Sequence, residues 1–141
     1  MDVRPKHGVA NAITIVIGSD LDIVAARQRG RTLATQLGYS TTDATLIATA
    51  ISELARNIVL YARRGEIVLA SANEDKRSAI VVVARDDGPG IADVNRALVG
   101  GYSTSGGLGL GLSGVRRLMD VFEISSELGK GTTITVKRWK R

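Results

Sequence analysis

The sequence predicts an α/β two-layer sandwich, in which helices cover one face of a mixed, largely antiparallel sheet. Two observations lead to this prediction. The segments 21–37 and 41–62 repeat apolar residues at steps of three and four, which is typical of helices that bury one side. Two pairs of β-branched runs are each joined by a short polar turn, which is typical of antiparallel hairpins.

The first part of the chain predicts one strand and two long helices. Residues 12–17 are β-branched and predict a strand, and Gly18-Ser19-Asp20 then supplies a turn and a helix cap. The first helix ends at Gly38; the second is capped by Thr41-Thr42-Asp43 and runs to Ala62, with Gly65 as its stop. The faces expected to be buried are Ile23, Ala26, Gly30, Leu33 and Leu37 on the first helix, and Ile47, Ile51, Leu54, Ile58 and Tyr61 on the second.

The rest of the chain predicts two hairpins with an irregular segment between them. The strands are expected at 66–71 and 79–85, around a turn at 73–77, and at 121–126 and 132–137, around a turn at 129–131. Between the hairpins we expect a short helix at 93–98, a mobile lid at 100–106 and a helix at 112–119. Residues 1–141 are expected to form a single domain.

The composition is that of an ordinary globular chain, with 44% hydrophobic and 23% charged residues. The absence of cysteine excludes disulfides and thiolate metal sites. No apolar run approaches the roughly 20 residues of a membrane helix, and the first residues lack the apolar core of a secretory signal. We therefore expect a cytoplasmic protein.

The net charge is +5, and much of the basic excess is local. Arginines gather at 27–31 and at 63–64, and the tail 137–141 reads Lys-Arg-Trp-Lys-Arg. These groups can be a solvated helix face and a frayed terminus, or they can dock an acidic partner. Nucleic-acid binding is disfavoured because no base-reading motif accompanies the charge and aromatic residues make up only 4% of the chain.

Three polar residues follow one edge of the second predicted helix. Glu53 and Asn57 are four residues apart and therefore share a face, and Arg56 lies beside them. An amide oxygen can bind Mg²⁺, a guanidinium can neutralise a phosphate, and a carboxylate can accept a proton. The same three residues can also form a solvent-facing polar edge with no role in chemistry.

A second polar segment comes directly after a predicted strand, where Asp86 is followed by Gly88 and Gly90. Asp86 can accept a hydrogen bond from an exocyclic amine, and the glycines allow a flat ring to approach the backbone. The alternative is an ordinary surface turn, since Asp-Gly and Pro-Gly pairs both favour turns.

The third segment alternates glycine with leucine and opens a helix: Gly107, Leu108, Gly109, Leu110, Gly111 and Leu112. Glycines allow close approach to a bulky anion, and a helix N-terminus presents free N–H groups and a positive dipole to phosphate. A dinucleotide-binding fold is disfavoured because no strand precedes the loop and too little chain follows it. A Walker A loop is absent, and His7, the single histidine, excludes a histidine-based triad.

In this order and spacing, the three segments resemble the N, G1 and G2 boxes of the GHKL ATP-binding superfamily, which has the Bergerat fold. Gly129-x-Gly131-Thr132 resembles the motif whose threonine supports adenine recognition. Residues 84–91 and 107–120 are similar to the stressosome switch kinases of the RsbT type, which are serine/threonine kinases. The resemblance covers nearly the whole chain.

The resemblance implies a role for each of these residues around ATP and Mg²⁺. Asp86 would bind the adenine amine with the help of Thr132, and Gly88 and Gly90 would allow close approach. Asn57 would hold Mg²⁺, and Arg56 would stabilise the charge of the γ-phosphate. Backbone N–H groups from 107 to 112 would cradle the phosphates, and Glu53 would be the catalytic base for a serine or threonine hydroxyl.

The resemblance also implies partners. The substrates would be STAS-domain proteins of the RsbS and RsbR kind, and release from them would let the kinase activate a PP2C-type phosphatase of the RsbU kind. Neither nucleic acid nor membrane is expected as a partner. Two alternatives remain open: an anti-sigma factor kinase of the SpoIIAB/RsbW type, and a non-catalytic binding module gated by ATP.

Overall fold

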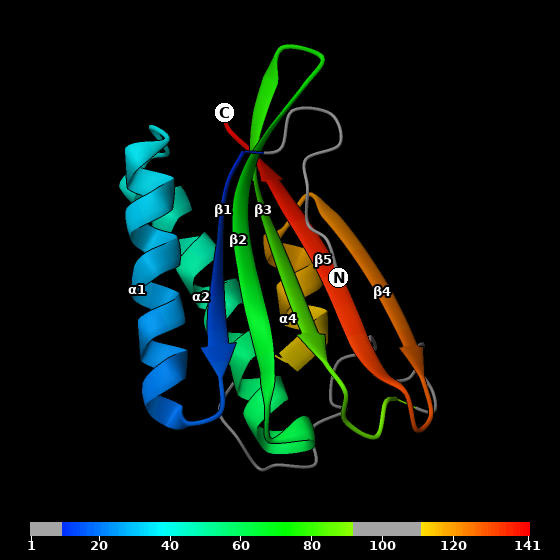
Figure 1. Cartoon of the computed structure of the whole chain (residues 1–141). Helices are drawn as coiled ribbons and strands as arrows, with labels where there is room; N and C mark the ends of the chain where they lie inside the picture. The colour runs from blue at the N-terminus through cyan, green and yellow to red at the C-terminus, as the bar shows by residue number, and fades with distance from the viewer. Residues whose placement is uncertain (1–9, 92–110) are drawn as a thin grey trace.

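The computed structural model describes residues 10–91 and 111–141. In this part of the chain, a five-stranded sheet in the order β1-β2-β3-β5-β4 is covered on one face by helices (Figure 1). The elements in chain order are β1 (Ala10–Ile17), α1 (Asp20–Gln36), α2 (Thr41–Asn57), the π-helical turn η1 (Ile58–Ala62), β2 (Gly65–Glu74), β3 (Arg77–Asp86), α4 (Gly111–Leu118), β4 (Val121–Glu127) and β5 (Gly131–Trp139).

The two-layer sandwich predicted from the sequence is confirmed. Each of the four strand pairings among the described residues is antiparallel, so these strands contain no parallel component. The core lies between the sheet and the helices, because alternate strand residues and one stripe of each helix are apolar. The predicted helix at 93–98 and the predicted lid at 100–106 lie outside the described residues.

Helix α2 follows its predicted stripe closely, and Ile47, Ile51 and Leu54 are almost completely buried. Its cap is one residue earlier than expected, since the Ser40 hydroxyl accepts a hydrogen bond from the backbone N–H of Asp43 at 3.1 Å. The prediction for Tyr61 was wrong, because this side chain is 47% exposed. The chain winds as a π-helix from Ile58, so each residue advances less around the axis and Tyr61 leaves the apolar stripe.

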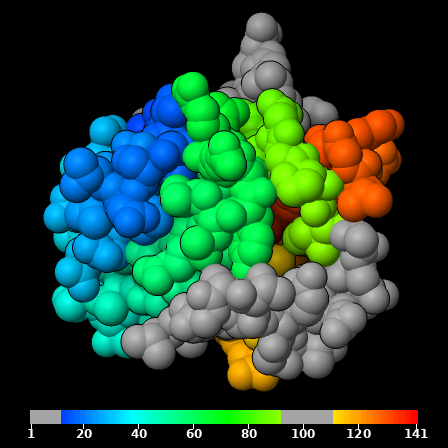
Figure 2. Space-filling view, turned by 90° about the horizontal axis from the view of Figure 1, so that it is seen from below, coloured from blue at the N-terminus to red at the C-terminus, as the bar shows by residue number. Residues whose placement is uncertain are grey.

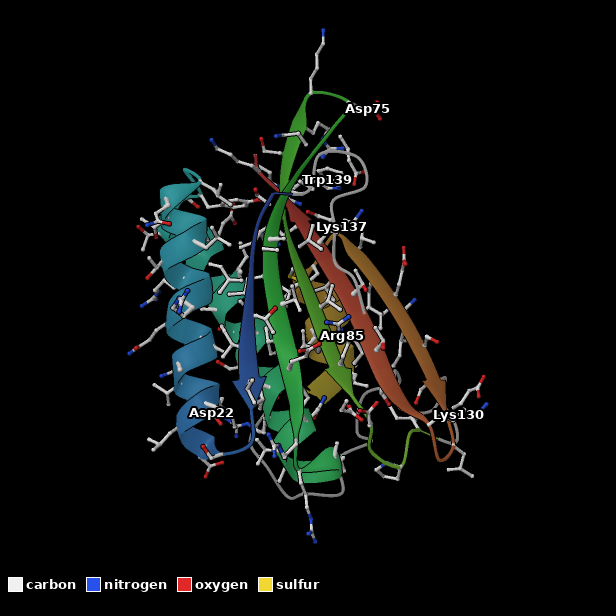
Figure 3. All side chains as sticks on the ribbon, viewed as in Figure 1. Asp22, Asp75, Arg85, Lys130, Lys137 and Trp139 are labelled. Atoms are coloured by element: carbon white, nitrogen blue, oxygen red, sulfur yellow. The ribbon has the colours of Figure 1, made fainter. Side chains whose placement is uncertain are left out.

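The basic tail belongs to the fold and is not a frayed terminus. Strand β5 extends to Trp139, and the tail cations pair within the chain. Lys137 bonds Glu74, Arg138 bonds Asp43 and Arg141 bonds Asp120. Figure 3 shows Lys137 and Trp139 near the end of β5 and Lys130 at the opposite end of that strand. Most of the tail's positive charge is therefore used internally and not held free for a partner.

The elements that carry the predicted site residues meet at one end of the sandwich. The end of β3, the turn η1, the β4–β5 turn and the N-terminal end of α4 all lie toward the bottom of Figure 1. Among the described residues, no helix is both long enough and apolar enough to cross a membrane.

Candidate functional site

Asp86 is the last residue of β3 and forms the centre of a hydrogen-bonded cluster. Its Oδ1 accepts the backbone N–H of Gly88 at 2.8 Å, and the backbone N–H of Thr132 also donates to its carboxylate. Burial raises the pKa of Asp86, and these two N–H groups oppose that rise. The carboxylate is thus held in place and left short of compensating charge, which suits it to accept a hydrogen bond from a ligand.

Gly88 and Gly65 bring the Asp86 cluster against the end of the long helix. A Cβ at Gly88 would lie 2.5 Å from Cβ of Ala62, the last residue of η1. A Cβ at Gly65 would lie 2.9 Å from the Ile58 side chain and 3.1 Å from Cβ of Asp86. Only glycine fits such contacts. Ile58, which directly follows Asn57, is therefore packed beside the turn after Asp86.

Ser126 is a site-forming residue that the sequence did not indicate. Its hydroxyl accepts the N–H of Ile91 at 2.7 Å, lies 2.8 Å from the Thr132 hydroxyl and is 3.2 Å from the Gly131 carbonyl. Together with the bond from Gly129 N–H to the Pro89 carbonyl at 2.7 Å, it fixes the segment after Asp86 to the β4–β5 hairpin. A lone serine in a strand has no local signal, because its partners come from other elements.

Glu53 and Gly111 are brought together at the N-terminal end of α4. Glu53 lies on α2 and is only 7% exposed. Its Oε2 accepts the backbone N–H of Gly111 in a long bond of 3.4 Å. Gly111 is the first residue of α4 and has φ of +67°. A buried carboxylate therefore lies where the free N–H groups of a helix would bind an anion.

Seven further predicted residues fall in three groups. Arg56 and Asn57 are half-buried in the last turn of α2, and Arg56 Nε is buried with no hydrogen-bond partner among residues 10–91 and 111–141. Leu112 is buried in the core, so its side chain is structural. Gly107, Leu108, Gly109 and Leu110 lie outside the described residues.

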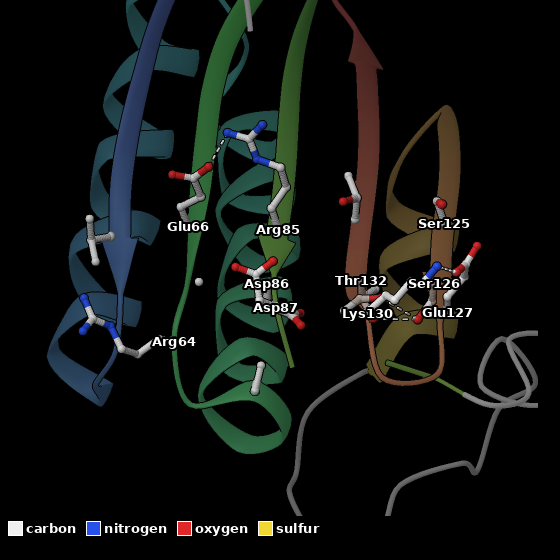
Figure 4. A pocket seen from close by; sticks show the side chains of 15 residues that line it. Arg64, Glu66, Arg85, Asp86, Asp87, Ser125, Ser126, Glu127, Lys130 and Thr132 are labelled. Atoms are coloured by element: carbon white, nitrogen blue, oxygen red, sulfur yellow. Dashed lines mark hydrogen bonds and ion pairs between the residues drawn. The ribbon is translucent and has the colours of Figure 1, made fainter. Parts of the chain in front are cut away.

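A cavity of about 820 Å³ opens beside the Asp86 cluster. The view of Figure 2 from below shows a hollow next to the end of β3 in which parts of β5 and α4 are visible, whereas no residue of α4 lines the 820 Å³ cavity. The lining residues labelled in Figure 4 include Asp86 and Thr132, with the ion pair of Arg85 and Glu66 on the wall. Glu53 and Asn57 do not line this cavity. Of the predicted adenine residues, Asp86 and Thr132 line it and Gly88 and Gly90 do not.

Metal ligands are sparse in this part of the molecule. Within residues 10–91 and 111–141, no group of three or more histidine, cysteine, aspartate or glutamate side chains could hold a metal ion. The amide of Asn57 is a single neutral ligand. That donor set does not suit a resident metal, but it fits Mg²⁺ that arrives on nucleotide phosphates, because Mg²⁺ commonly takes only one or two protein ligands there.

Comparisons with known proteins show the family and the fold of this chain. The family described as histidine kinase-, DNA gyrase B- and HSP90-like ATPase matches residues 42–141. The solved structure of the mycobacterial sensor histidine kinase MprB has a TM-score of 0.56 at 14% identity, over 93% of this chain and 97% of that one, and so shares the fold.

Similarity in sequence narrows the family. The serine/threonine-protein kinase RsbT of Bacillus subtilis is 50% identical over 125 residues, which are 89% of this chain and 94% of RsbT. The anti-sigma F factor of Clostridium acetobutylicum is 27% identical over 80% of this chain and 82% of its own, and that of Geobacillus stearothermophilus is 29% identical over 73% and 74%. The chain therefore belongs to the histidine kinase-, DNA gyrase B- and HSP90-like ATPases, and within them to the RsbT-type serine/threonine-protein kinases.

Proposed function

We propose that this chain transfers the γ-phosphate of ATP to a serine or threonine hydroxyl of STAS-domain stressosome proteins of the RsbS and RsbR kind. Once released from them, it binds and activates a PP2C-type phosphatase of the RsbU kind. The family supports ATP use and a serine/threonine kinase. The partners and the residue roles below are part of the proposal.

The Asp86 cluster would hold the adenine. The Asp86 carboxylate already accepts two backbone N–H groups and keeps acceptor capacity for the exocyclic amine. The Thr132 side chain lies beside it and is held by Ser126. Gly88 and Gly90 keep the turn after Asp86 packed against Ala62 and the Glu127 backbone, so the position of the carboxylate is fixed. All four groups belong to the rigid edge of the sheet, so binding would require little rearrangement.

The α2–α4 contact would hold the phosphates. The N–H of Gly111 and those of residues 107–112 would face the phosphate oxygens at the positive end of α4. Arg56 would neutralise the γ-phosphate, and its buried, partnerless Nε is the kind of donor that a bound anion would satisfy. Asn57 would hold Mg²⁺, which supplies charge neutralisation between the phosphates when bound.

The single observation that carries the proposal is the position of Glu53. This buried carboxylate accepts the Gly111 N–H in a long bond of 3.4 Å, and it lies at the N-terminal end of α4. In the transfer step, the hydroxyl oxygen of the substrate bonds to the γ-phosphorus while the bond between the γ-phosphorus and the bridging oxygen breaks. Glu53 accepts the hydroxyl proton, and ADP leaves.

The proposal is tested by incubating the chain with labelled ATP, Mg²⁺ and a purified STAS-domain protein, and then mapping the label. We expect labelled phosphoserine or phosphothreonine in the STAS protein. Label that stays in ATP, or that is released only as inorganic phosphate, would refute the transfer function. Activation of a PP2C-type phosphatase by the free chain tests the switch function separately.

The anti-sigma factors that match at 27–29% identity make the second candidate a kinase that binds a sigma factor. The 50% identity to RsbT favours the switch kinase over it. Co-purification of a sigma factor with the chain would favour the anti-sigma function. Partner regulation that persists after Glu53→Ala would favour a non-catalytic binding module instead.

A further inference from the structure

Arg138, near the end of β5, holds two helices together at the end of the molecule away from the candidate site. Its Nη1 donates to the carbonyl of Leu118, the last residue of α4, at 2.6 Å. Its Nη2 donates to Oδ1 of Asp43, in the first turn of α2, at 2.8 Å. The side chains of Arg138 and Asp43 are only 12% and 18% exposed, so this is an ion pair shielded from water.

The charges of this pair suit both helix ends. A cation lies at the C-terminal end of α4, where the helix dipole is negative, and an anion lies at the N-terminal end of α2, where it is positive. A guanidinium can serve both acceptors at once because its N–H groups point in fixed directions. The backbone around Arg138 is also fixed, since its carbonyl accepts the Tyr39 hydroxyl at 2.7 Å.

The opposite end of α4 meets α2 through the predicted catalytic residue. Gly111 begins α4 and donates to Glu53 on α2, while Leu118 ends α4 and is joined to α2 through Arg138 and Asp43. The two helices are therefore antiparallel and connected at both ends. Since α4 has eight residues and is only about 12 Å long, a shift at its C-terminal end moves its N-terminal end as well.

We propose that Arg138 is a positioning residue for the phosphate end of the nucleotide site. By fixing the C-terminal end of α4 on α2, it determines where the N–H groups at the N-terminal end of α4 lie relative to Glu53. This inference rests on the proposed nucleotide site. It assigns Arg138 no contact with nucleotide, and it predicts that the adenine end, built from β3 and the β4–β5 turn, is independent of the ion pair.

The test compares ligands with and without phosphates. Affinities for ADP with Mg²⁺ and for adenosine are measured by calorimetry on the full chain, with Arg138→Lys and Asp43→Asn as the variants. Lysine keeps the charge but cannot reach both acceptors in the fixed geometry of a guanidinium. Asparagine keeps the shape and one acceptor oxygen of Asp43 while removing its charge, so it is the milder of the two changes.

The matched control is Lys137→Gln. Lys137 is the neighbouring residue of β5 and also forms an ion pair, but that pair joins it to Glu74 of β2 and not to a helix. We expect Arg138→Lys to raise the dissociation constant of ADP about tenfold and to leave that of adenosine within about twofold. Asp43→Asn should move ADP in the same direction by less, and Lys137→Gln should change neither ligand.

The outcomes separate the two proposals. Equal weakening of ADP and adenosine in both Arg138→Lys and Asp43→Asn would mean a general loss of structure and would overturn the positioning role. Unchanged ADP affinity in both variants would overturn it as well. A wild-type chain that binds neither ligand would refute the nucleotide site itself, and the positioning role with it.

Discussion

The two ends of the candidate site differ in how well their polar groups are satisfied. At the sheet edge, the carboxylate of Asp86 has two backbone donors, and the Ser126 hydroxyl has partners on three sides. At the helix end, Glu53 accepts a long bond of 3.4 Å from the Gly111 N–H, and within the described part of the chain Arg56 Nε has no partner. Among the described residues, the cluster of Asp86 and Ser126 at the proposed adenine end is therefore well satisfied, although Nε and Nη1 of the adjacent Arg85 are buried without partners. The proposed phosphate end, with Glu53 and Arg56, has fewer hydrogen bonds to its polar groups.

This difference suggests a division of work in the proposed kinase. A rigid edge can select the base without rearranging, because its groups are already oriented by the fold. Groups that must exchange partners during phosphoryl transfer are better held loosely before the ligand arrives. Variants at the two ends should therefore fail in different ways.

The largest effect is expected at Glu53. Glu53→Gln keeps the shape and one acceptor for Gly111 but removes the base, so transfer to a STAS-domain protein should fall by about 10²–10⁴-fold while ATP affinity changes little. The measurement pairs a labelled-phosphate assay with calorimetry. Ser52→Ala, which removes a neighbouring buried hydroxyl bonded to the Ala48 carbonyl, is the control and should keep near-normal transfer. Normal turnover in Glu53→Gln would exclude Glu53 from the mechanism.

Asp86→Asn should weaken nucleotide binding at the proposed adenine end of the site. It replaces a charged acceptor of the exocyclic amine with an amide, and we expect nucleotide affinity to fall about 10- to 100-fold. Burial raises the pKa of Asp86, so the ionised carboxylate costs the folded protein stability above that pKa, and asparagine removes this cost. Asparagine also weakens the hydrogen bonds from the two backbone N–H groups, so the two effects oppose each other. The free energy of unfolding near pH 7 should therefore change by less than about 1 kcal/mol. The control is Asp87→Asn.

The same raised pKa predicts a pH dependence. As the pH falls through the pKa of Asp86, the carboxyl gains a proton and loses acceptor capacity, so wild-type nucleotide affinity should fall. In Asp86→Asn this acid-side loss should be absent. An equal loss in both proteins would place the titrating group elsewhere.

The packing of the sheet edge can be tested with two glycines of one turn. Gly131 and Gly129 both have positive φ, +95° and +80°. A Cβ at Gly131 would lie 2.1 Å from the Asp86 carbonyl oxygen, whereas nothing lies within 4 Å of one at Gly129. Chemical denaturation should therefore show Gly131→Ala to be less stable than Gly129→Ala by at least about 2 kcal/mol. Equal losses would show that the turn can move away from Asp86.

The smallest effect is expected at Asp120, far from the site. Hydrogen bonds from Trp139 N–H and Arg141 outweigh partial burial and lower the pKa of Asp120. Its contribution to stability is therefore present above its unfolded pKa and is lost as the pH falls through the folded pKa. Asp120→Asn should cost no more than about 1 kcal/mol near pH 7 and should reduce the loss of stability in acid. Unchanged acid unfolding would contradict this assignment.

Much of the fold could be predicted from periodicity, because the apolar stripes and the hairpins report burial directly. The stripe of α2 was predicted correctly through Ile58, and both hairpins were found. The position of Tyr61 could not be predicted, since a switch from α to π winding depends on what packs against the helix. The ion pairing of the basic tail could not be predicted either, because Asp43 and Arg138 are 95 residues apart in sequence.

The site was predicted in part. Motif spacing indicated Asp86 and Gly88, and the family resemblance added Thr132; the structure brings these three together. Motif spacing also indicated Glu53 and Gly111, which are in contact. It did not indicate Ser126, whose role depends on three partners from different segments. Motifs reveal residues whose chemical type suits a ligand, whereas Ser126 carries no such signal because its role depends on tertiary packing alone.

The most direct test of the account is a structure of this chain with a non-hydrolysable ATP analogue and Mg²⁺. The account predicts the Asp86 carboxylate on the exocyclic amine of the adenine, and the Gly111 N–H turned from Glu53 to a phosphate oxygen. An analogue bound elsewhere, with Glu53 still bonded to Gly111 and Asp86 away from the base, would contradict it.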